Sequence, residues 1–200
     1  MALYFYSGSK NVPAGKGIHE SGEYENLPDN FRRVLSNFHV YPFKWNGYTW
    51  NSIEHAFQGS KIWLQCEEKG RSFTIEGGDT SDGLSARKRR KCVILTPQNL
   101  RIWNAQKESI MYEISLAKYS QCKEASEILK NTKSAELWHI QMRAKPVRFV
   151  HLEKIREILN HTLGDTYDPK VMGTPDPIPM VEPYPKKLMI PLVKIGRAHV

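Results

Sequence analysis

The chain has 200 residues, of which 40% are hydrophobic, 25% charged and 10% aromatic, and its formal net charge is +8. This composition is typical of a soluble globular protein and excludes a chain that is disordered throughout, and the length predicts a single domain. No apolar run approaches the roughly 20 residues that span a bilayer, so we expect no membrane segment.

The positive charge belongs mainly to residues 1–165, which hold 24 basic and 18 acidic residues and therefore carry +6. Such a field favours phosphates as partners, on a small molecule or along a nucleic acid such as DNA. The first ten residues contain no basic segment followed by an apolar one, so secretion is not expected. Cys66, Cys92 and Cys122 are odd in number and widely spaced, which favours a reduced cytoplasmic or nuclear location over a disulfide framework or a metal site.

The first elements predicted are a strand and a hairpin. Residues 3–6 are apolar and aromatic and predict a short strand. Residues 38–45 and 48–50 flank the pair Asn46-Gly47. This pair predicts a two-residue hairpin turn, because both residues accept a positive φ.

Residues 52–64 predict an amphipathic helix. Its apolar residues recur at helical spacing: Ile53, Ala56, Phe57 and Leu64, with Trp63 beside them. At about 100° per residue, Glu54, Gln58 and Lys61 share an adjacent polar strip. A carboxylate, an amide and an amine are therefore expected on one patch of a partly buried helix. Glu54 also follows Asn51 by three residues, so a capping box is the structural alternative.

Thr96 and Pro97 predict the start of a second long helix over 98–120, with a hydroxyl cap and a proline in the first turn. Its apolar stripe consists of Leu100, Trp103, Ile110, Ile114 and Ala117. Lys107 and Lys118 project close to that stripe, where an amine lines a cavity or extends past the apolar surface to solvent.

Residues 124–130 predict a short helix, and residues 152–163 predict a final amphipathic helix that Gly164 can end. Between them a period-two pattern predicts a strand with Trp138, Ile140 and Met142 on one face and His139, Gln141 and Arg143 on the other. Seven of the twelve prolines fall in the last 35 residues, which predicts an extended or disordered tail over 166–200 after a domain over 1–165.

The elements together predict a mainly helical α+β fold, with a small β-hairpin or sheet packed on helices 52–64 and 98–120. Five consecutive cations remain outside them: Arg87, Lys88, Arg89, Arg90 and Lys91. Such a run most often forms a solvated basic loop, and the alternative is a nuclear-localisation or nucleic-acid patch.

One region carries a specific set of motifs. Residues 35–61 contain LSNF, PF, a predicted hairpin and SIEHAFQGSK. They resemble the YbiA-like (NADAR) family, which has a Ser-Asn-Phe motif and a Ser-x-Glu-His-x-Phe-Gln-x-x-Lys helix. The matching residues are Ser36, Asn37, Phe38, Ser52, Glu54, His55, Phe57, Gln58 and Lys61. Further matches follow in the same order at Ala86, Arg87, Arg90, Trp103, Met111, Ala117, Lys118, Tyr119 and Gln121.

The resemblance implies a single YbiA-like domain with N-glycosidase activity. In the family this activity is described for phosphorylated ribosylamino intermediates of riboflavin synthesis and for ADP-ribose attached to guanine in DNA. In both substrates an exocyclic amine of an aromatic base is bonded to the anomeric carbon of a ribose that carries phosphate. The expected ligand is thus a phosphorylated ribosyl small molecule or an ADP-ribosyl group, with no cofactor and no metal.

Cleavage of this bond passes through an oxocarbenium-like state and needs a group that protonates the leaving nitrogen or activates water. Glu54 is the candidate, with Lys61 as a catalytic partner that orients it or shifts its pKa. Base stacking is assigned to Trp50, Trp103 and Tyr119, and phosphate binding to Arg87, Arg90, Lys118 and Arg143. The remaining substrate-binding candidates are Asn37, Phe38, His55, Gln58 and His139.

Structural alternatives exist for several of these residues. Trp103 lies on an apolar stripe typical of a core, His55 is compatible with simple packing, and His139 with the wet face of an edge strand. The family's Asp-x-x-Trp-Gly and Gly-x-Asn-x-Leu-Gly stretches have no counterpart, and LWHIQMRAK occupies their place at residues 137–145. A catalytically silent module that binds ADP-ribose-like ligands or nucleic acid is therefore the alternative to an enzyme.

Overall fold

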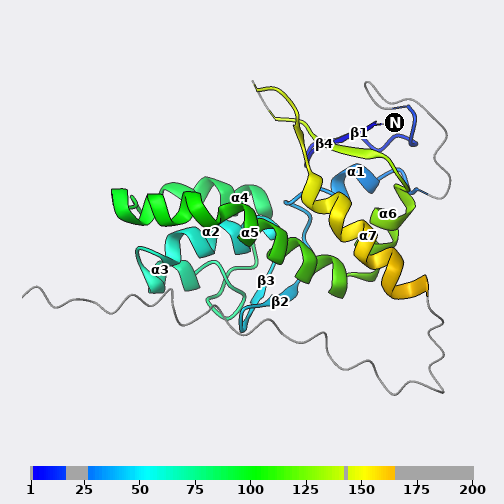
Figure 1. Ribbon diagram of the computed structural model, residues 1–200. Helices are drawn as coiled ribbons and strands as arrows, with labels where there is room; N and C mark the ends of the chain where they lie inside the picture. Colours follow the sequence, from blue (N-terminus) through cyan, green and yellow to red (C-terminus); the bar gives the residue numbers. More distant parts are fainter. Residues whose placement is uncertain (1, 17–26, 142–143, 165–200) are drawn as a thin grey trace, which may run out of the picture. The chain divides into compact units, whose positions relative to one another are not determined.

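Helices dominate the described chain, and two small sheets accompany them, so the predicted α+β class is confirmed (Figure 1). The computed structural model describes residues 2–16, 27–141 and 144–164. The proline-rich segment over 166–200 and the candidate Arg143 lie outside the described residues. None of the helices within those three described ranges has the length and apolar character needed to cross a membrane.

The larger sheet joins the two ends of the described chain. Strand β1 (Ala2–Phe5) pairs in parallel with β4 (Glu136–His139), which pairs antiparallel with β5 (Val147–Arg148). The register sets Leu3 opposite Leu137, and both side chains are fully buried. The strand predicted at residues 3–6 is therefore confirmed.

The predicted faces of the strand near Trp138 are wrong. The strand ends at His139, and within it Leu137 is buried while Trp138 is only half-buried. Because side chains alternate along a strand, the inward face carries Leu137 and His139. The His139 ring stacks on Phe149, with ring centroids 4.9 Å apart, so His139 does not lie on a wet edge.

The predicted hairpin is confirmed. Strands β2 (Phe43–Trp45) and β3 (Tyr48–Trp50) pair antiparallel around Asn46 and Gly47, whose φ angles are +53° and +78°. The first strand begins at Phe43 rather than at residue 38. The buried indole of Trp50 donates a hydrogen bond to the Trp45 carbonyl oxygen at 2.9 Å, which fixes this side chain inside the core.

The helix predicted at residues 52–64 is α2 (Ile53–Trp63). Its N-cap is Ser52, whose hydroxyl oxygen accepts a hydrogen bond from the His55 backbone N–H at 3.3 Å. The Asn51 side chain instead donates to the Ser81 carbonyl oxygen. The structural alternative of a capping box between Asn51 and Glu54 is therefore wrong, because the cap lies one residue later.

The other predicted helices are confirmed as α5 (Pro97–Gln121), α6 (Lys123–Asn131) and α7 (Val150–Gly164). Thr96 caps α5 and accepts a hydrogen bond from the Asn99 N–H at 3.2 Å. Helix α5 contacts α2 and β2 as well as α6 and α7, so it connects the part of the domain around α2 and the hairpin with the part around α6 and α7.

Four short helical segments have no strong sequence signal: α1 (Phe31–Val34), α3 (Glu67–Arg71), α4 (Gly83–Lys88) and the 3-10 helix η1 (Arg89–Lys91). The last two contain the five-cation run, so the predicted basic loop is wrong. Asp82 caps α4 by accepting from the Ser85 N–H at 2.8 Å. A Cβ on Gly83 would lie 2.5 Å from the Phe38 Cα, so glycine permits α4 to approach that backbone.

Gly59 permits the close packing of α2 on the hairpin. A Cβ at this position would lie 2.5 Å from a ring carbon of Trp50 and 3.0 Å from the Phe73 Cβ. Gly59→Ala should lower the free energy of unfolding by about 1–3 kcal/mol, because overpacking outweighs the better helix propensity of alanine. Urea denaturation measures this change. In a Trp50→Phe background, which removes the second ring, the same substitution should cost less; a Gly59→Ala protein as stable as wild type would contradict the packing argument.

Candidate functional site

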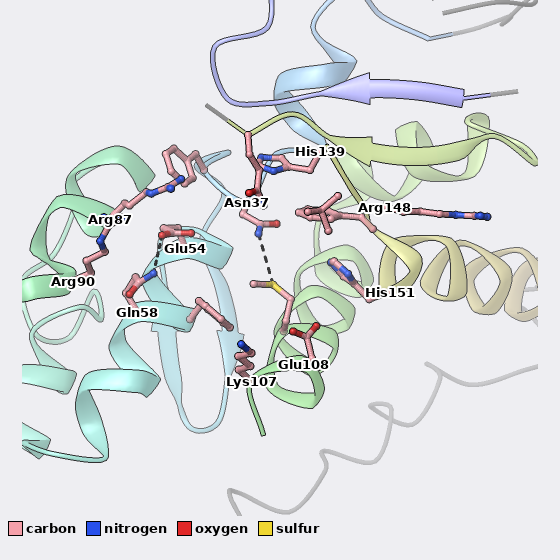
Figure 2. A pocket seen from close by; sticks show the side chains of 16 residues that line it. Asn37, Glu54, Gln58, Arg87, Arg90, Lys107, Glu108, His139, Arg148 and His151 are labelled. Atoms are coloured by element: carbon pink, nitrogen blue, oxygen red, sulfur yellow. Dashed lines mark hydrogen bonds between the residues drawn. The ribbon is translucent and has the colours of Figure 1, made fainter. Parts of the chain in front are cut away.

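A cavity of about 330 Å³ is lined by residues from both sides of the domain (Figure 2). This volume is at the lower end of the range for small-molecule sites. One side, called here the Glu54 wall, consists of Glu54, Gln58, Arg87 and Arg90. The other, called the imidazole wall, consists of His139, Phe149 and His151. The remaining lining residues are Asn37, Phe38, Phe57, Lys107, Glu108, Met111, Gln141, Val147 and Arg148.

Glu54 lies in the first turn of α2, with only 7% of its surface exposed. Its carboxylate accepts a hydrogen bond from the Gln58 amide at 3.0 Å, and its backbone N–H donates to the Asn37 carbonyl oxygen at 3.0 Å. Burial raises the pKa of Glu54 above its ordinary value, and the Gln58 hydrogen bond and the charges of Arg87 and Arg90 oppose this rise. A buried carboxyl with a raised pKa in a cavity has the properties of a general acid.

Arg87 and Arg90 bring positive charge to the same wall. Both side chains are exposed, and neither forms an ion pair with a carboxylate in the described part of the chain. The Arg87 guanidinium lies 5.8 Å from the centroid of the Phe38 ring. Guanidinium groups that are free of carboxylate partners can bind phosphate in a bidentate manner.

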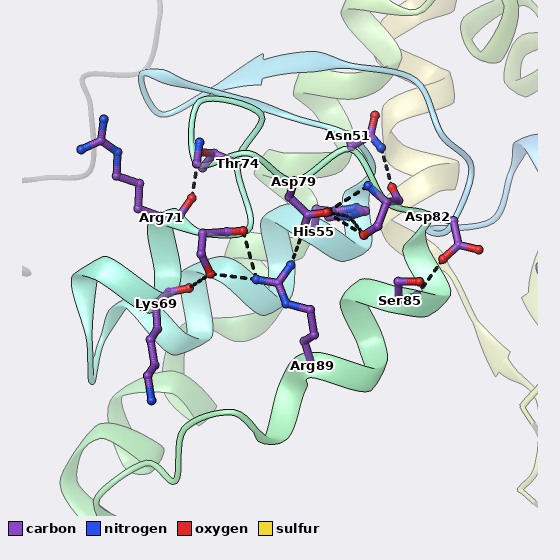
Figure 3. Close-up of polar contacts among 12 residues, drawn as sticks. Asn51, His55, Lys69, Arg71, Thr74, Asp79, Asp82, Ser85 and Arg89 are labelled. Carbon is purple, nitrogen blue, oxygen red and sulfur yellow. Dashed lines mark hydrogen bonds and ion pairs between the residues drawn. The ribbon is translucent and has the colours of Figure 1, made fainter.

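Arg89, between these two arginines in the sequence, does not line the cavity and instead points toward Asp79 (Figure 3). Its guanidinium forms an ion pair with the buried Asp79 and donates to the carbonyl oxygen and the hydroxyl of Ser72 at 3.0 and 2.8 Å. It also stacks over Phe73, 4.1 Å from the ring centroid. The basic run is thus divided: Arg89 pairs with Asp79, while Arg87 and Arg90 line the cavity.

His55 belongs to the same anchoring network and not to the cavity. Its ring is fully buried, and its two nitrogens contact the hydroxyl oxygens of Ser52 at 2.8 Å and Ser81 at 3.3 Å. Ser81 also donates to Asp79 from its N–H and its hydroxyl, at 3.0 and 2.6 Å. Burial lowers the pKa of His55, opposed by the nearby Asp79. The network therefore connects the start of α2 to Arg89.

The imidazole wall has a different chemical character. The rings of His139 and Phe149 lie nearly parallel, at 13°, and the centroids of Phe149 and His151 are 4.7 Å apart. The pKa of both histidines is lowered to about 4, mainly by burial and, for His139, also by the nearby charge of Arg87. Both imidazoles are therefore neutral at pH 7, and this wall is aromatic and uncharged.

Three buried polar atoms around the cavity have no hydrogen-bond partner within the described residues: Asn37 Oδ1, Gln58 Oε1 and His151 Nε2. The Asn37 amide nitrogen is 3.7 Å from the Met111 sulfur, which leaves its oxygen unused. An unsatisfied buried polar group costs about 1–3 kcal/mol, so several around one cavity indicate a ligand that would satisfy them.

The structure brings half of the predicted site residues together. Those that line the cavity are Glu54, Asn37, Phe38, Gln58, Arg87, Arg90 and His139. Those that do not are Lys61, Trp50, His55, Trp103, Lys118 and Tyr119. Lys61 follows Glu54 by two helical turns, so it shares the strip but lies about 10 Å farther along the axis.

The predicted stacking residues lie in the core. Trp50 is 1% exposed, Trp103 packs edge-on against Phe57 with ring centroids 4.8 Å apart, and Tyr119 is fully buried. Lys118 is also fully buried, and its ammonium donates to the His39 carbonyl oxygen at 3.4 Å. Burial lowers the pKa of Lys118 to about 8. None of these four groups is placed to touch a ligand in the cavity.

Some lining residues were missed from the sequence. Lys107 and Met111 had weak signals, one beside the apolar stripe and the other among the family matches. Val147, Phe149 and His151 had none, because their position depends on the pairing of β5 with β4 and on the turn into α7. Local periodicity contains no information about such long-range contacts.

No family model matches the chain, and no curated protein matches it. Among solved structures, the NMR structure of the E. coli protein YbiA is similar, with 22% sequence identity and a TM-score of 0.49. The match covers 66% of this chain and 79% of that chain.

The anchoring network generates a stability prediction. Arg89→Met leaves the buried Asp79 carboxylate without its cation, and we expect the free energy of unfolding to fall by about 1.5–3 kcal/mol. The matched control is Lys88→Met, which removes an exposed cation from the same run and should change stability by less than about 0.5 kcal/mol. Thermal and urea denaturation would test this, and equal effects of the two substitutions would refute an anchoring role for Arg89.

The neutral histidines generate a pH prediction. His139 and His151 have folded pKa values of about 4 against an ordinary value of 6.5, so the unfolded chain binds more protons between these limits. The free energy of unfolding should therefore fall as the pH drops from 7 to 4.5. Urea denaturation across this range should show a smaller fall for the double variant His139→Gln/His151→Gln. His161→Gln, which removes an exposed imidazole on α7, should follow the wild-type curve; a double variant that does so too would contradict the assignment.

Proposed function

We propose that this protein is an N-glycosidase that hydrolyses the bond between an aromatic-base amine and ribose phosphate. The observation that carries the proposal is the buried Glu54 carboxyl, which opens into a cavity beside the exposed guanidinium groups of Arg87 and Arg90. The motifs that resemble the YbiA-like family support the same reaction, because its Glu-His and Ala-Arg motifs supply Glu54 and Arg87.

The reaction can be written with this chain's residues. Protonated Glu54 gives its proton to the leaving amine as the bond between C1′ and nitrogen breaks, and the resulting carboxylate stabilises the oxocarbenium-like sugar. Water then adds to C1′, and its proton returns to Glu54. The products are the free aromatic amine and a ribose phosphate, and the acid is regenerated in its starting form.

Phosphate binding would assist the acid. Arg87 and Arg90 lower the pKa of Glu54, against the larger effect of burial. A phosphate bound to these guanidinium groups offsets their charge and weakens their effect on Glu54. The protonated form of Glu54 is then favoured when substrate is present, which couples binding to the state of the acid.

A second candidate substrate is ADP-ribose attached to guanine in nucleic acid. A surface hollow of about 310 Å³ adjoins the Glu54 wall and shares two arginines with it. Its lining residues are Leu84, Arg87, Lys88, Arg90 and Lys91. A basic hollow that shares Arg87 and Arg90 with the cavity favours a substrate with more phosphates than one small sugar phosphate carries.

Glu54→Gln should lower kcat by roughly 10²–10⁴, because the amide keeps the shape of the carboxyl but has no titratable proton. Affinity for ribose 5-phosphate should change little, since Arg87 and Arg90 remain. The matched control is Glu108→Gln, which neutralises the other cavity carboxylate, an exposed group on α5, and should leave turnover within about threefold. Chromatography of the base released from a ribosylamino phosphate over time measures kcat for each variant.

Parallel assays separate the candidate functions. Release of ADP-ribose from an ADP-ribosylated guanine oligonucleotide, but no cleavage of the ribosylamino phosphate, would select the second substrate. Binding without turnover of either substrate, and unchanged by Glu54→Gln, would identify the alternative of a silent ADP-ribose or nucleic-acid binding module. Near wild-type turnover by Glu54→Gln would remove Glu54 from the mechanism.

A further inference from the structure

The imidazole wall lies across the cavity from Glu54 and has no role in the acid chemistry (Figure 2). Its residues come from three consecutive parts of the chain: His139 ends β4, Phe149 follows β5, and His151 lies in the first turn of α7. The stack of His139 on Phe149, with centroids 4.9 Å apart, holds two flat groups side by side. Phe149 also packs edge-on against Phe5, 5.6 Å away, which fixes its orientation.

The three rings of the imidazole wall carry no charge, whereas Lys107 and Glu108 of α5 line another part of the cavity. Arg148 lines the cavity with part of its side chain, but its guanidinium turns away to Glu136 and Glu153, at 2.8 and 2.9 Å (Figure 2). His139 and His151 are neutral at pH 7, because burial lowers the pKa of each to about 4. The positive charge of Arg87 and Arg90 is thus confined to the Glu54 wall, and the two walls suit chemically different parts of a ligand.

Two unsatisfied polar atoms border the uncharged side. Asn37 is 8% exposed, and its Oδ1 has no partner among the described residues, although its amide nitrogen is used. His151 Nε2 is likewise buried and unpartnered in the described part of the chain. A carbonyl oxygen and an imidazole nitrogen beside flat rings match the amine and ring-nitrogen groups at the edge of a heterocycle.

We propose that the imidazole wall is the base-binding side of the site: the flat rings of His139, Phe149 and His151 receive an aromatic heterocycle, and Asn37 Oδ1 accepts a hydrogen bond from its amine edge. The identity of the ligand as a ribosylated heterocycle rests on the proposed function, whereas the binding itself needs no chemistry at Glu54. The phosphate then lies at Arg87 and Arg90, and the sugar spans the cavity with C1′ near Glu54.

The test compares two probes by isothermal titration calorimetry of the whole protein. Guanosine 5′-monophosphate carries base, ribose and phosphate, and ribose 5-phosphate lacks only the base. Stacking and edge hydrogen bonds should make the nucleotide bind roughly tenfold or more tightly than the sugar phosphate. Phe149→Leu, which removes the flat ring, and Asn37→Ala should reduce this difference severalfold without changing the affinity for ribose 5-phosphate.

The controls separate recognition from folding. Phe149→Trp keeps an aromatic face and should keep the preference for the nucleotide, and Arg87→Met should weaken both probes together. Circular dichroism and thermal denaturation identify variants that remain folded, and His151→Leu gives a second test at the wall should Phe149→Leu not fold.

Three results would overturn the proposal: equal affinities of the wild-type protein for the two probes, no measurable binding of the nucleotide, or folded wall variants that weaken both probes equally. Failure of the proposed function has a different signature. A preserved preference for the nucleotide without any glycosidase turnover would support the base-binding wall and refute the enzyme, whereas turnover without that preference would refute the wall alone.

Discussion

The ion pair between Asp79 and Arg89 determines where the positive charge of this protein can act. Asp79 is buried, and an unpaired carboxylate there would be costly; Arg89, the first residue of η1, supplies its cation. On a tight helical segment, neighbours of an inward residue point elsewhere, and Arg87 and Arg90 consequently line the cavity. His55 and Ser81 connect the same pair to the start of α2, the helix that carries Glu54.

Burial and the neighbouring polar groups have opposite effects on the pKa of Glu54. Burial favours the protonated carboxyl, while Gln58 and the two arginines favour the carboxylate. In the proposed mechanism the same arginines bind phosphate, so the protonation state of Glu54 would respond to substrate. The proposal thus uses Glu54 first as an acid and then as a base in one cycle.

The opposite side of the cavity is built by the end of β4, the residue after β5 and the first turn of α7. The parallel pairing of β1 with β4 holds this segment in place, and Phe5 packs against both His139 and Phe149. In the proposed function this wall binds the base, and its residues are therefore the ones that would decide which base is accepted.

The sequence by itself determined the elements whose signals are local. The pair Asn46-Gly47 was sufficient to predict the hairpin, because few pairs of residues accept a positive φ at both positions. Thr96-Pro97 marked the start of α5, and the apolar spacing after Ser52 defined α2 with Glu54 and Gln58 on one strip. These features depend on neighbours within about four residues, a range over which residue type and spacing are informative.

Only the tertiary structure decided which side chains meet. Trp103 lies on the apolar stripe of α5 and Lys118 lies beside it, at spacings that suit a core or a cavity equally. The packing of α5 on α2 and the hairpin puts both in the core. The shared strip of Glu54, Gln58 and Lys61 was predicted, but not that the cavity extends along it only as far as Gln58. His139 faces inward because its register with β1 is set by residues more than 130 positions away. Periodicity along one element does not indicate such a distant partner, so the imidazole wall could not be predicted without the fold.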